Sequence, residues 1–187
     1  MKLFISLIVL IFSLSGKSQT IPVEGYVDYK YEFSDWAYIK DVNNVLDKFV
    51  GTWTGTYDQK SYSFFVTKIK QELTHVKLRE DILLMRYTIT DAGGNTIEDT
   101  TKLPDDHELV IDGQYMDEGG KYVLHYAGRE FSCGQGGDVL IGMMEGSNNT
   151  QMFLKVFGGS ETWLSCTTGY AEPLLPYKKN YVVLTKQ

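Results

Sequence analysis

The sequence lacks the motifs by which enzymes and metal-binding proteins are usually recognised. It contains no Gly-x-Ser-x-Gly motif, which would mark a serine nucleophile. Its three histidines, His75, His107 and His125, lie in separate segments without His-x-x-x-His spacing, and no Cys-x-x-Cys occurs. We therefore predict no catalytic residue, no metal site and no cofactor. Only convergence of His107 or His125 with Asp105 or Asp106 in a cleft would favour an enzyme.

Glycine-rich and acidic stretches are present, but they lack the patterns of phosphate and calcium sites. CGQGGD, residues 133–138, has neither the Lys-Ser/Thr ending nor the following helix of a phosphate loop. We interpret it as the bulged start of a strand. LPDDHELVIDG (103–113) and DAGGNTIED (91–99) lack the alternating acids, central glycine and closing glutamate of a calcium loop. Solvated turns explain both acidic stretches better than a calcium site.

Positive charge is scarce. The 18 Lys and Arg residues face 24 Asp and Glu residues, for a formal net charge of -6. Loss of Lys2 and Lys17 with an N-terminal signal would leave 16 basic residues against 24 acidic ones, or a charge near -8. An acidic surface repels the phosphates of nucleic acids and anionic lipids. We therefore predict no nucleic-acid partner.

Long apolar runs are also missing, except for one at the N-terminus that is too short to cross a bilayer. Lys2 precedes an apolar run at 3–14, and small or polar residues follow it. A membrane span needs about 20 apolar residues, whereas this layout is typical of a secretory signal peptide. We predict a signal peptide over residues 1–19 with cleavage within residues 16–20. The mature chain would then be secreted or periplasmic and have no membrane span.

Only two cysteines, Cys133 and Cys166, are present, and both lie in the part predicted to be exported. In an oxidising compartment such a pair favours a disulfide bond over a metal or catalytic site. Two separate buried thiols are the alternative.

The composition and the periodicity both indicate strands. Four prolines against 18 glycines and 13 tyrosines describe a β-rich chain with many tight turns. From residue 51 onward, apolar residues recur with a period of two, as in strands that bury one face. The predicted strands, joined by short turns, cover residues 51–57, 62–70, 82–90, 108–116, 121–128, 139–145, 151–157 and 180–186.

About eight strands joined by short turns predict an all-β domain, either a sandwich or a barrel. We favour an antiparallel up-and-down β-barrel, because neighbouring strands pair and closure removes exposed edges. The chain length suits one domain. We expect a signal peptide at 1–19, an N-terminal arm at 20–42 and the barrel domain at 43–187.

Two segments before the first long strand have other patterns. The arm is aromatic without a clean period, and three roles stay open: an extended arm, an edge strand near Gly25–Tyr31, or a cover over one end of the domain. NNVLDKF, residues 43–49, places Val45, Leu46 and Phe49 at helical spacing behind Asn43, which can cap a first turn. We predict one short helical turn there.

This helical turn, followed by Gly51-Thr52-Trp53 at the start of a strand, resembles the Gly-x-Trp signature of lipocalins and their bacterial relatives. The resemblance implies an eight-stranded barrel in which Trp53 packs across the closed end and the other end opens onto an apolar cavity. It gives structural roles to Gly51 and Trp53. Lipocalins often carry an arginine near the last strand that packs over the tryptophan. The basic residues near that strand here are Lys178, Lys179 and Lys186.

A second resemblance is to a family of small secreted proteins of unknown function from Bacteroidota, and it covers most of the chain after the signal peptide. It is carried by LDKFVGTWTGTYDQKSYSF (46–64), LLMRYTI (83–89), IEDTTKLPDD (97–106) and LTKQ (184–187). The likeness implies export and a fold, and it brings no assigned activity.

Strand alternation turns large apolar and aromatic side chains to one face, which we predict to be the barrel interior. An eight-stranded barrel has the size at which such side chains either fill the interior or leave a cavity, and the sequence leaves both outcomes open. The candidate ligand-binding residues on this face are Tyr57, Phe64, Met85, Tyr87, Tyr122 and Tyr126.

Two hypotheses for function follow from these patterns. In the first, the chain is an exported, non-catalytic protein that binds a small apolar or amphipathic molecule inside its barrel. In the second, it is a structural or protein-interaction module of the cell envelope with a solid barrel, and the aromatic arm between Tyr26 and Tyr38 docks a partner.

Overall fold

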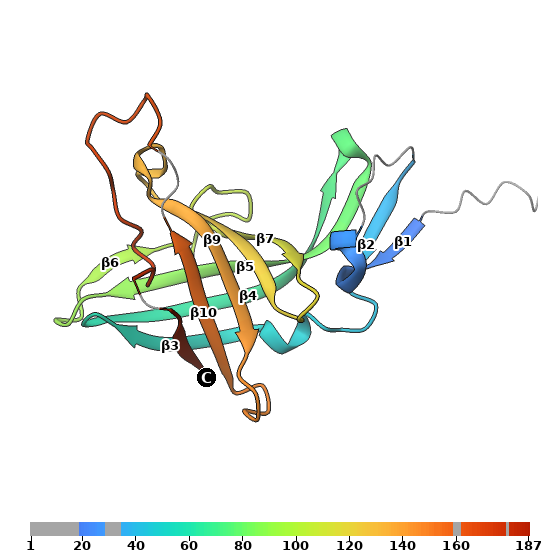
Figure 1. Cartoon of the computed structure of the whole chain (residues 1–187), viewed down its shortest axis with the longest axis horizontal. Coiled ribbons are helices and arrows are strands. Elements are labelled where there is room, and N and C mark those ends of the chain that lie inside the picture. The colour runs from blue at the N-terminus through green and yellow to red at the C-terminus, as the bar shows by residue number, and fades with distance from the viewer. Residues whose placement is uncertain (1–18, 29–34, 159–161, 179) are drawn as a thin grey trace, which may run out of the picture.

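The computed structural model describes residues 19–28, 35–158, 162–178 and 180–187. At its centre is a closed antiparallel barrel of eight strands (Figure 1). Most of the predicted signal peptide lies in residues 1–18, outside the described residues. The barrel strands are β3 (Gly51–Tyr57), β4 (Lys60–Leu73), β5 (Leu78–Thr90), β7 (Ile111–Met116), β8 (Tyr122–Ala127), β9 (Gly136–Met143), β10 (Gln151–Gly158) and β11 (Val182–Lys186).

The barrel closes because β5 pairs with β7 through Leu84 with Asp112 and Met85 with Ile111. The order around the ring is β5, β4, β3, β11, β10, β9, β8 and β7. All neighbours in this ring are antiparallel. The prediction of an all-β up-and-down barrel is therefore confirmed, and each ring strand coincides with one predicted strand apart from small shifts at the ends.

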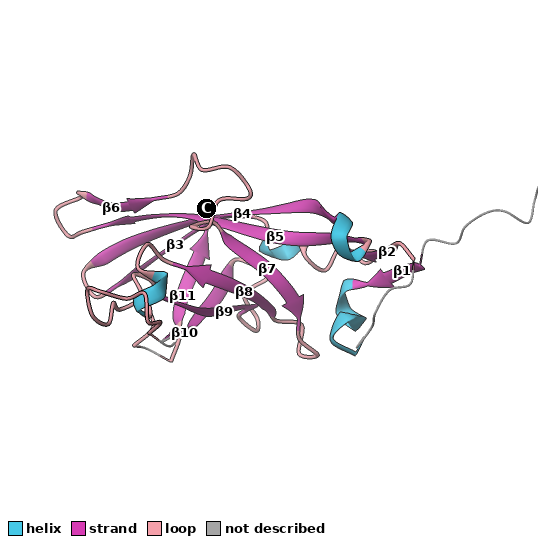
Figure 2. Ribbon diagram, turned by 90° about the horizontal axis from the view of Figure 1, so that it is seen from above, coloured by secondary structure: helices cyan, strands magenta, loops and turns pink. Residues whose placement is uncertain are grey.

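Strand β5 carries three partners along the edge opposite β4. Strand β2 (Ala37–Lys40) pairs in parallel with the start of β5, β7 pairs with its middle, and β6 (Thr96–Asp99) pairs with its end. Strand β1 (Gln19–Pro22) adds to β2 in parallel. The pair β1 and β2 and the strand β6 therefore extend beyond the barrel at opposite ends of β5 (Figure 2).

The helices of the described residues are short 3-10 turns, and none of them is long and apolar enough to cross a membrane. They are η2 (Val23–Asp28), η3 (Asp47–Phe49), η4 (Thr74–Val76) and η5 (Phe131–Cys133). An edge strand near Gly25–Tyr31 is therefore wrong for residues 25–28, which belong to η2.

The described part of the arm shares the hydrophobic core of the barrel. Ile21, Val23, Ala37 and Ile39 are all buried in the same cluster as the barrel interior. These residues come from β1, η2 and β2, which lie together beside the start of β5. Of the three roles left open by the sequence, a cover over one end of the domain describes this segment best.

The helical turn before β3 forms as η3 (Asp47–Phe49), but the prediction that Asn43 caps it is wrong. The carboxylate of Asp41 binds the free backbone groups there instead. It accepts the N–H of Val45 at 2.7 Å and that of Leu46 at 3.2 Å. A charged acceptor makes stronger bonds to backbone donors than an amide does, which explains why the buried acid takes this place.

Trp53 lies fully buried at the end of the barrel near η3, and its Nε1 donates to the carbonyl of Phe49 at 2.7 Å. Lys186 of the last strand places its Nζ 5.2 Å from the centre of the Trp53 ring. Lys186 therefore takes the position in which the resemblance expects an arginine. Gly51 has a φ of +132°, and a Cβ there would lie 2.9 Å from Cε of Lys186, so the position requires glycine.

Candidate functional site

The predicted ligand-binding residues come together inside the barrel and pack against one another. Five of them are at most 2% exposed, and Tyr57 is half-buried at the rim. The ring centroids of Phe64 and Tyr87 lie 6.4 Å apart, and those of Tyr87 and Tyr126 lie 6.3 Å apart. Aromatic rings at such distances are in contact. These side chains therefore build a core at the place where the sequence allowed a cavity.

The tyrosine hydroxyls in this core are bonded to the protein itself. Tyr62 donates to the carbonyl of Leu174 at 3.3 Å, and the hydroxyl of Tyr126 accepts the N–H of Leu174 at 3.4 Å. The hydroxyls of Tyr87 and Tyr126 are hydrogen-bonded to each other, and the N–H of Leu83 donates to the hydroxyl of Tyr122 at 3.4 Å. Burial raises the pKa of Tyr62 and Tyr126 to about 12. The hydroxyls are therefore neutral groups whose hydrogen bonds link the barrel strands to one another and to Leu174.

The partner of two of these tyrosines is a segment that closes the barrel mouth, opposite Trp53. We call residues Ala171–Lys178, between β10 and β11, the covering segment. Pro173, Leu175 and Pro176 are buried, and Leu175 belongs to the main core. Sequence reasoning missed this segment because it has no strand or helix period. Its only signal is the apolar Pro-Leu-Leu-Pro-Tyr run inside a loop.

A disulfide bond ties the chain that leads into the covering segment to the barrel. Cys133 and Cys166 are bonded with a Cα–Cα distance of 5.0 Å, which confirms the predicted pair. The N–H of Ala171 donates to the carbonyl of Cys133 at 2.8 Å, and Gln135 Nε2 donates to the carbonyl of Glu172 at 3.1 Å. The Gly-rich stretch around Cys133 thus anchors the cover at the start of β9.

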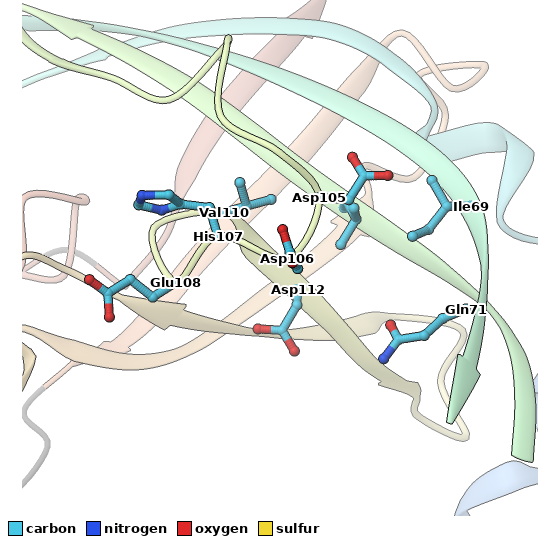
Figure 3. A pocket seen from close by; sticks show the side chains of 9 residues that line it. Ile69, Gln71, Asp105, Asp106, His107, Glu108, Val110 and Asp112 are labelled. Carbon is cyan, nitrogen blue, oxygen red and sulfur yellow. The ribbon is translucent and has the colours of Figure 1, made fainter. Parts of the chain in front are cut away.

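A different feature lies on the outer wall of the barrel, where the connection from β6 to β7 folds back over β4 and β5. We call residues Thr100–Val110 the outer loop. Two adjoining hollows run between this loop and the strands, with volumes of about 400 and 760 Å³. They share Ile69 and Asp105, and we call them together the outer trough; Figure 3 shows the smaller hollow.

The outer loop is held by a small second core and by one arginine. Ile82, Leu84 and Val110 form a buried cluster outside the barrel, with Ile69 and Leu103 packed against it. These strand residues are the outward-facing neighbours of the interior set. An outward cluster of this kind needs a cover, because exposed apolar surface is costly in water.

Arg86 makes the polar contacts of the outer loop. Its Nε donates to the carbonyl of Leu103 at 3.0 Å, and its Nη2 donates to Oδ1 of Asp105 at 2.6 Å. The side chain of Arg86 is only 14% exposed. Asp105 is therefore neutralised by Arg86.

The two ends of the trough differ in charge. The larger hollow contains Phe65 and Leu103 with Lys102 and Arg86, whereas the smaller one contains three further acids, Asp106, Glu108 and Asp112. The described residues include no ion pair of these three acids with Lys, Arg or His. Figure 3 shows Asp106, Glu108 and Asp112 around the same hollow. One end of the trough is therefore acidic.

Two carboxyl groups near the outer wall have raised pKa values: that of Asp112, which lines the smaller hollow, and that of Glu80, which lies outside the trough. Burial raises the pKa of Asp112, and the neighbouring His125 opposes this effect. Burial and then the negative charge of Asp112 raise the pKa of Glu80 on β5. Both pKa values are raised mainly because burial disfavours the ionised carboxylate.

Replacing Glu80 with glutamine is expected to stabilise the protein at pH 7 and to change its stability little near pH 4. A carboxyl group whose pKa is higher in the folded than in the unfolded protein makes its full contribution to stability below the pKa of the unfolded state, about 4.3. This contribution is lost as the pH rises through the pKa of the folded state. At pH 7 the unfolded chain carries an ionised Glu80, so folding must either half-bury that charge or protonate the carboxylate, and glutamine avoids this cost. Urea unfolding at both pH values measures the difference. Glu118→Gln, in an exposed turn, is the control, and an equal gain from both variants contradicts the expectation.

The outer trough also brings together His107, Asp105 and Asp106, whose convergence would favour an enzyme. His107 uses Nδ1 to accept the N–H of Leu109 at 3.1 Å, and Asp105 is paired with Arg86. The second candidate, His125 on β8, is the cross-strand partner of Asp112, and its Nδ1 lies 3.8 Å from Oδ1 of Asp138 on β9. Within the described ranges, no three His, Cys, Asp or Glu side chains are placed to hold a metal ion. The histidine and acids thus share a hollow without forming a hydrogen-bonded pair.

Comparison with known proteins adds a family and no function. A model of a family of unknown function, DUF6705, matches residues 1–136, which include the arm, β3 to β8 and the outer trough. No curated protein and no solved structure matches the chain.

Proposed function

The chain belongs to the DUF6705 family of unknown function, and we propose that it is an exported, non-catalytic barrel protein that binds a partner on its outside. The observation that carries this proposal is the closed mouth: Pro173, Leu175 and Pro176 are buried where a lipocalin-type barrel would admit a ligand. The second hypothesis from the sequence, a solid interaction module, is therefore favoured over an interior carrier.

The N-terminal pattern and the disulfide support export. Residues 1–19 have the layout of a signal peptide. The bond between Cys133 and Cys166 is of the kind that persists in oxidising compartments. Secretion or a periplasmic location and an origin in Bacteroidota stay predictions from the sequence.

The lipocalin type of the barrel is also part of the proposal. Its support is the η3 turn, the glycine at position 51 and the burial of Trp53 under Lys186. A non-catalytic role is supported by His107, whose Nδ1 is bonded to its own loop, and by Asp105, which Arg86 neutralises.

A ligand titration tests the closed interior. Fatty acids, haem and hydrophobic dyes should cause no saturable change in tryptophan fluorescence of the oxidised protein, because the interior side chains already contact one another. A variant with Leu175→Ala, which shortens a buried side chain of the covering segment, should bind dye more than the wild type. Saturable binding of one ligand per wild-type chain, seen also by native mass spectrometry, would contradict the closed interior and favour a protein that carries a ligand inside its barrel.

A further inference from the structure

We propose that the outer trough binds an extended segment of a partner protein in which an apolar side chain and a Lys or Arg side chain lie on the same face. This inference rests on the proposed role as an interaction protein and names the chemistry of its partner. The site is distinct from the barrel interior and from the arm.

The shape of the trough favours a chain segment. Its two hollows adjoin at Ile69 and Asp105, so neighbouring side chains of one segment reach both. In an extended chain, residues i and i+2 point the same way and lie about 7 Å apart. A segment of this kind places one side chain in each hollow.

The lining sets which side chain enters which hollow. Apolar atoms make up most of the exposed lining of both hollows. Phe65 and Leu103 contribute to the larger hollow, where the charge of Arg86 is paired with Asp105 and the remaining charge, on Lys102, would repel a basic side chain of the partner. The apolar side chain of the partner therefore fits there.

The smaller hollow fits the Lys or Arg side chain of the partner segment. Asp106 and Glu108 are exposed, and Asp112 lies at its edge. Arg86 already neutralises Asp105, and half-buried Asp112 accepts a hydrogen bond from Gln114, so the exposed Asp106 and Glu108 are the acids most accessible to a partner. A guanidinium or ammonium group would gain charge-assisted hydrogen bonds from them. The net charge of -6 steers a basic segment toward the protein as well.

A metal ion and a small amine fit these observations less well. The described side chains include no group of three acids placed around one metal position. A small amine would occupy only the acidic hollow and leave the apolar lining around Phe65 and Leu103 uncovered. The two-part lining is matched by a ligand that is apolar at one end and basic at the other.

The test uses short capped peptides with Leu at position i and Arg at position i+2, titrated into the oxidised protein by calorimetry. Binding should weaken at least about tenfold when the peptide Arg is replaced by Glu, and clearly when its Leu is replaced by Ala. Raising the salt concentration should weaken it further, since exposed charges are screened. Arginine amide alone should bind much more weakly than the peptide.

Protein variants locate the contact. The double variant Asp106→Asn with Glu108→Gln should weaken binding of the Leu-Arg peptide about tenfold, because it removes the exposed acids of the smaller hollow. Glu118→Gln with Glu145→Gln changes the net charge equally at exposed turns outside the trough and should leave binding within about twofold of the wild type. Both acids of the first pair are exposed, so folding should be intact.

Three outcomes would overturn the proposal: no peptide binding, equal weakening by both double variants, or equal binding of arginine amide and peptide. The last would assign the acidic hollow to small cations. None of these outcomes bears on the barrel interior, which the dye and fatty-acid titration tests separately. Hydrogen exchange of the outer loop provides the positional readout, and protection of residues 100–110 by the peptide is expected.

Discussion

Replacing Cys133 and Cys166 together by serine is expected to lower the free energy of unfolding by about 4 kcal/mol. The two cysteines are 33 residues apart in sequence, and in the chain-entropy description a cross-link over such a loop stabilises the folded state by roughly that amount. Urea unfolding of the oxidised wild type and of the double variant measures the loss. Reduced wild type should behave like the variant, since the serine substitutions change little else.

The same variant should loosen the covering segment before the barrel unfolds. The disulfide fixes Cys166 beside η5, and the bonds of Ala171 and Gln135 continue that attachment. Without it, local opening uncovers the hydroxyls of Tyr62 and Tyr126. Limited proteolysis should then cut within residues 162–178 faster in the variant than in the wild type. Equal stability and equal cleavage of the two proteins would mean that the disulfide does not hold the cover.

The barrel was predictable because burial of one strand face leaves a period of two in the sequence. In β5, the inward residues Leu83, Met85, Tyr87 and Ile89 are all buried, as their alternation predicts. The short strands β1, β2 and β6 have four residues each. A run of that length has too few alternations to stand out from a loop, so the sequence did not reveal them.

The closed interior could not be read from the sequence, because it depends on the summed volume of side chains from many strands and from a loop. Five of the six candidate residues are buried in the main core and Tyr57 packs against it, but Leu175 enters the core from a segment without periodicity. Side chains from segments far apart in the sequence, such as Leu175, determine whether the interior is filled or contains a cavity.

The outer trough could have been anticipated in part from the apolar residues of β5. The acidic residues of the stretch 103–113 favoured a solvated turn instead. In ILLM, residues 82–85, apolar side chains occupy both faces of the strand, and a strand that is apolar on both faces is usually covered on both. The cover is the outer loop, whose Val110 packs on Leu84 and Ile82. The stretch at 103–113 was interpreted as a solvated turn. Asp105, Asp106 and Glu108 are indeed exposed, but Asp112 is half-buried in β7 and the apolar residues Leu103 and Val110 pack on the barrel wall.

Trp53 gives the second large expected effect, because it fills the end of the barrel that the covering segment does not reach. Its side chain is fully buried, its Nε1 donates to the carbonyl of Phe49, and Lys186 lies over its ring. Replacing it with alanine should lower the free energy of unfolding by about 3–5 kcal/mol, through lost burial and the cavity that remains.

Trp53→Phe keeps most of the ring volume but loses the donor to Phe49, and it should cost roughly 1–3 kcal/mol because that buried carbonyl is left unpaired. Urea unfolding measures both variants, and the phenylalanine variant provides an answer even if the alanine variant does not fold. Trp163→Ala is the matched control, since this tryptophan is 59% exposed and its loss should cost far less. A small effect of Trp53→Ala, similar to that of Trp163→Ala, would show that the base of the barrel is sealed by η3 and the arm without the tryptophan. Loss of stability confined to the Trp53 variants would show that the buried tryptophan is needed to fill this end of the barrel.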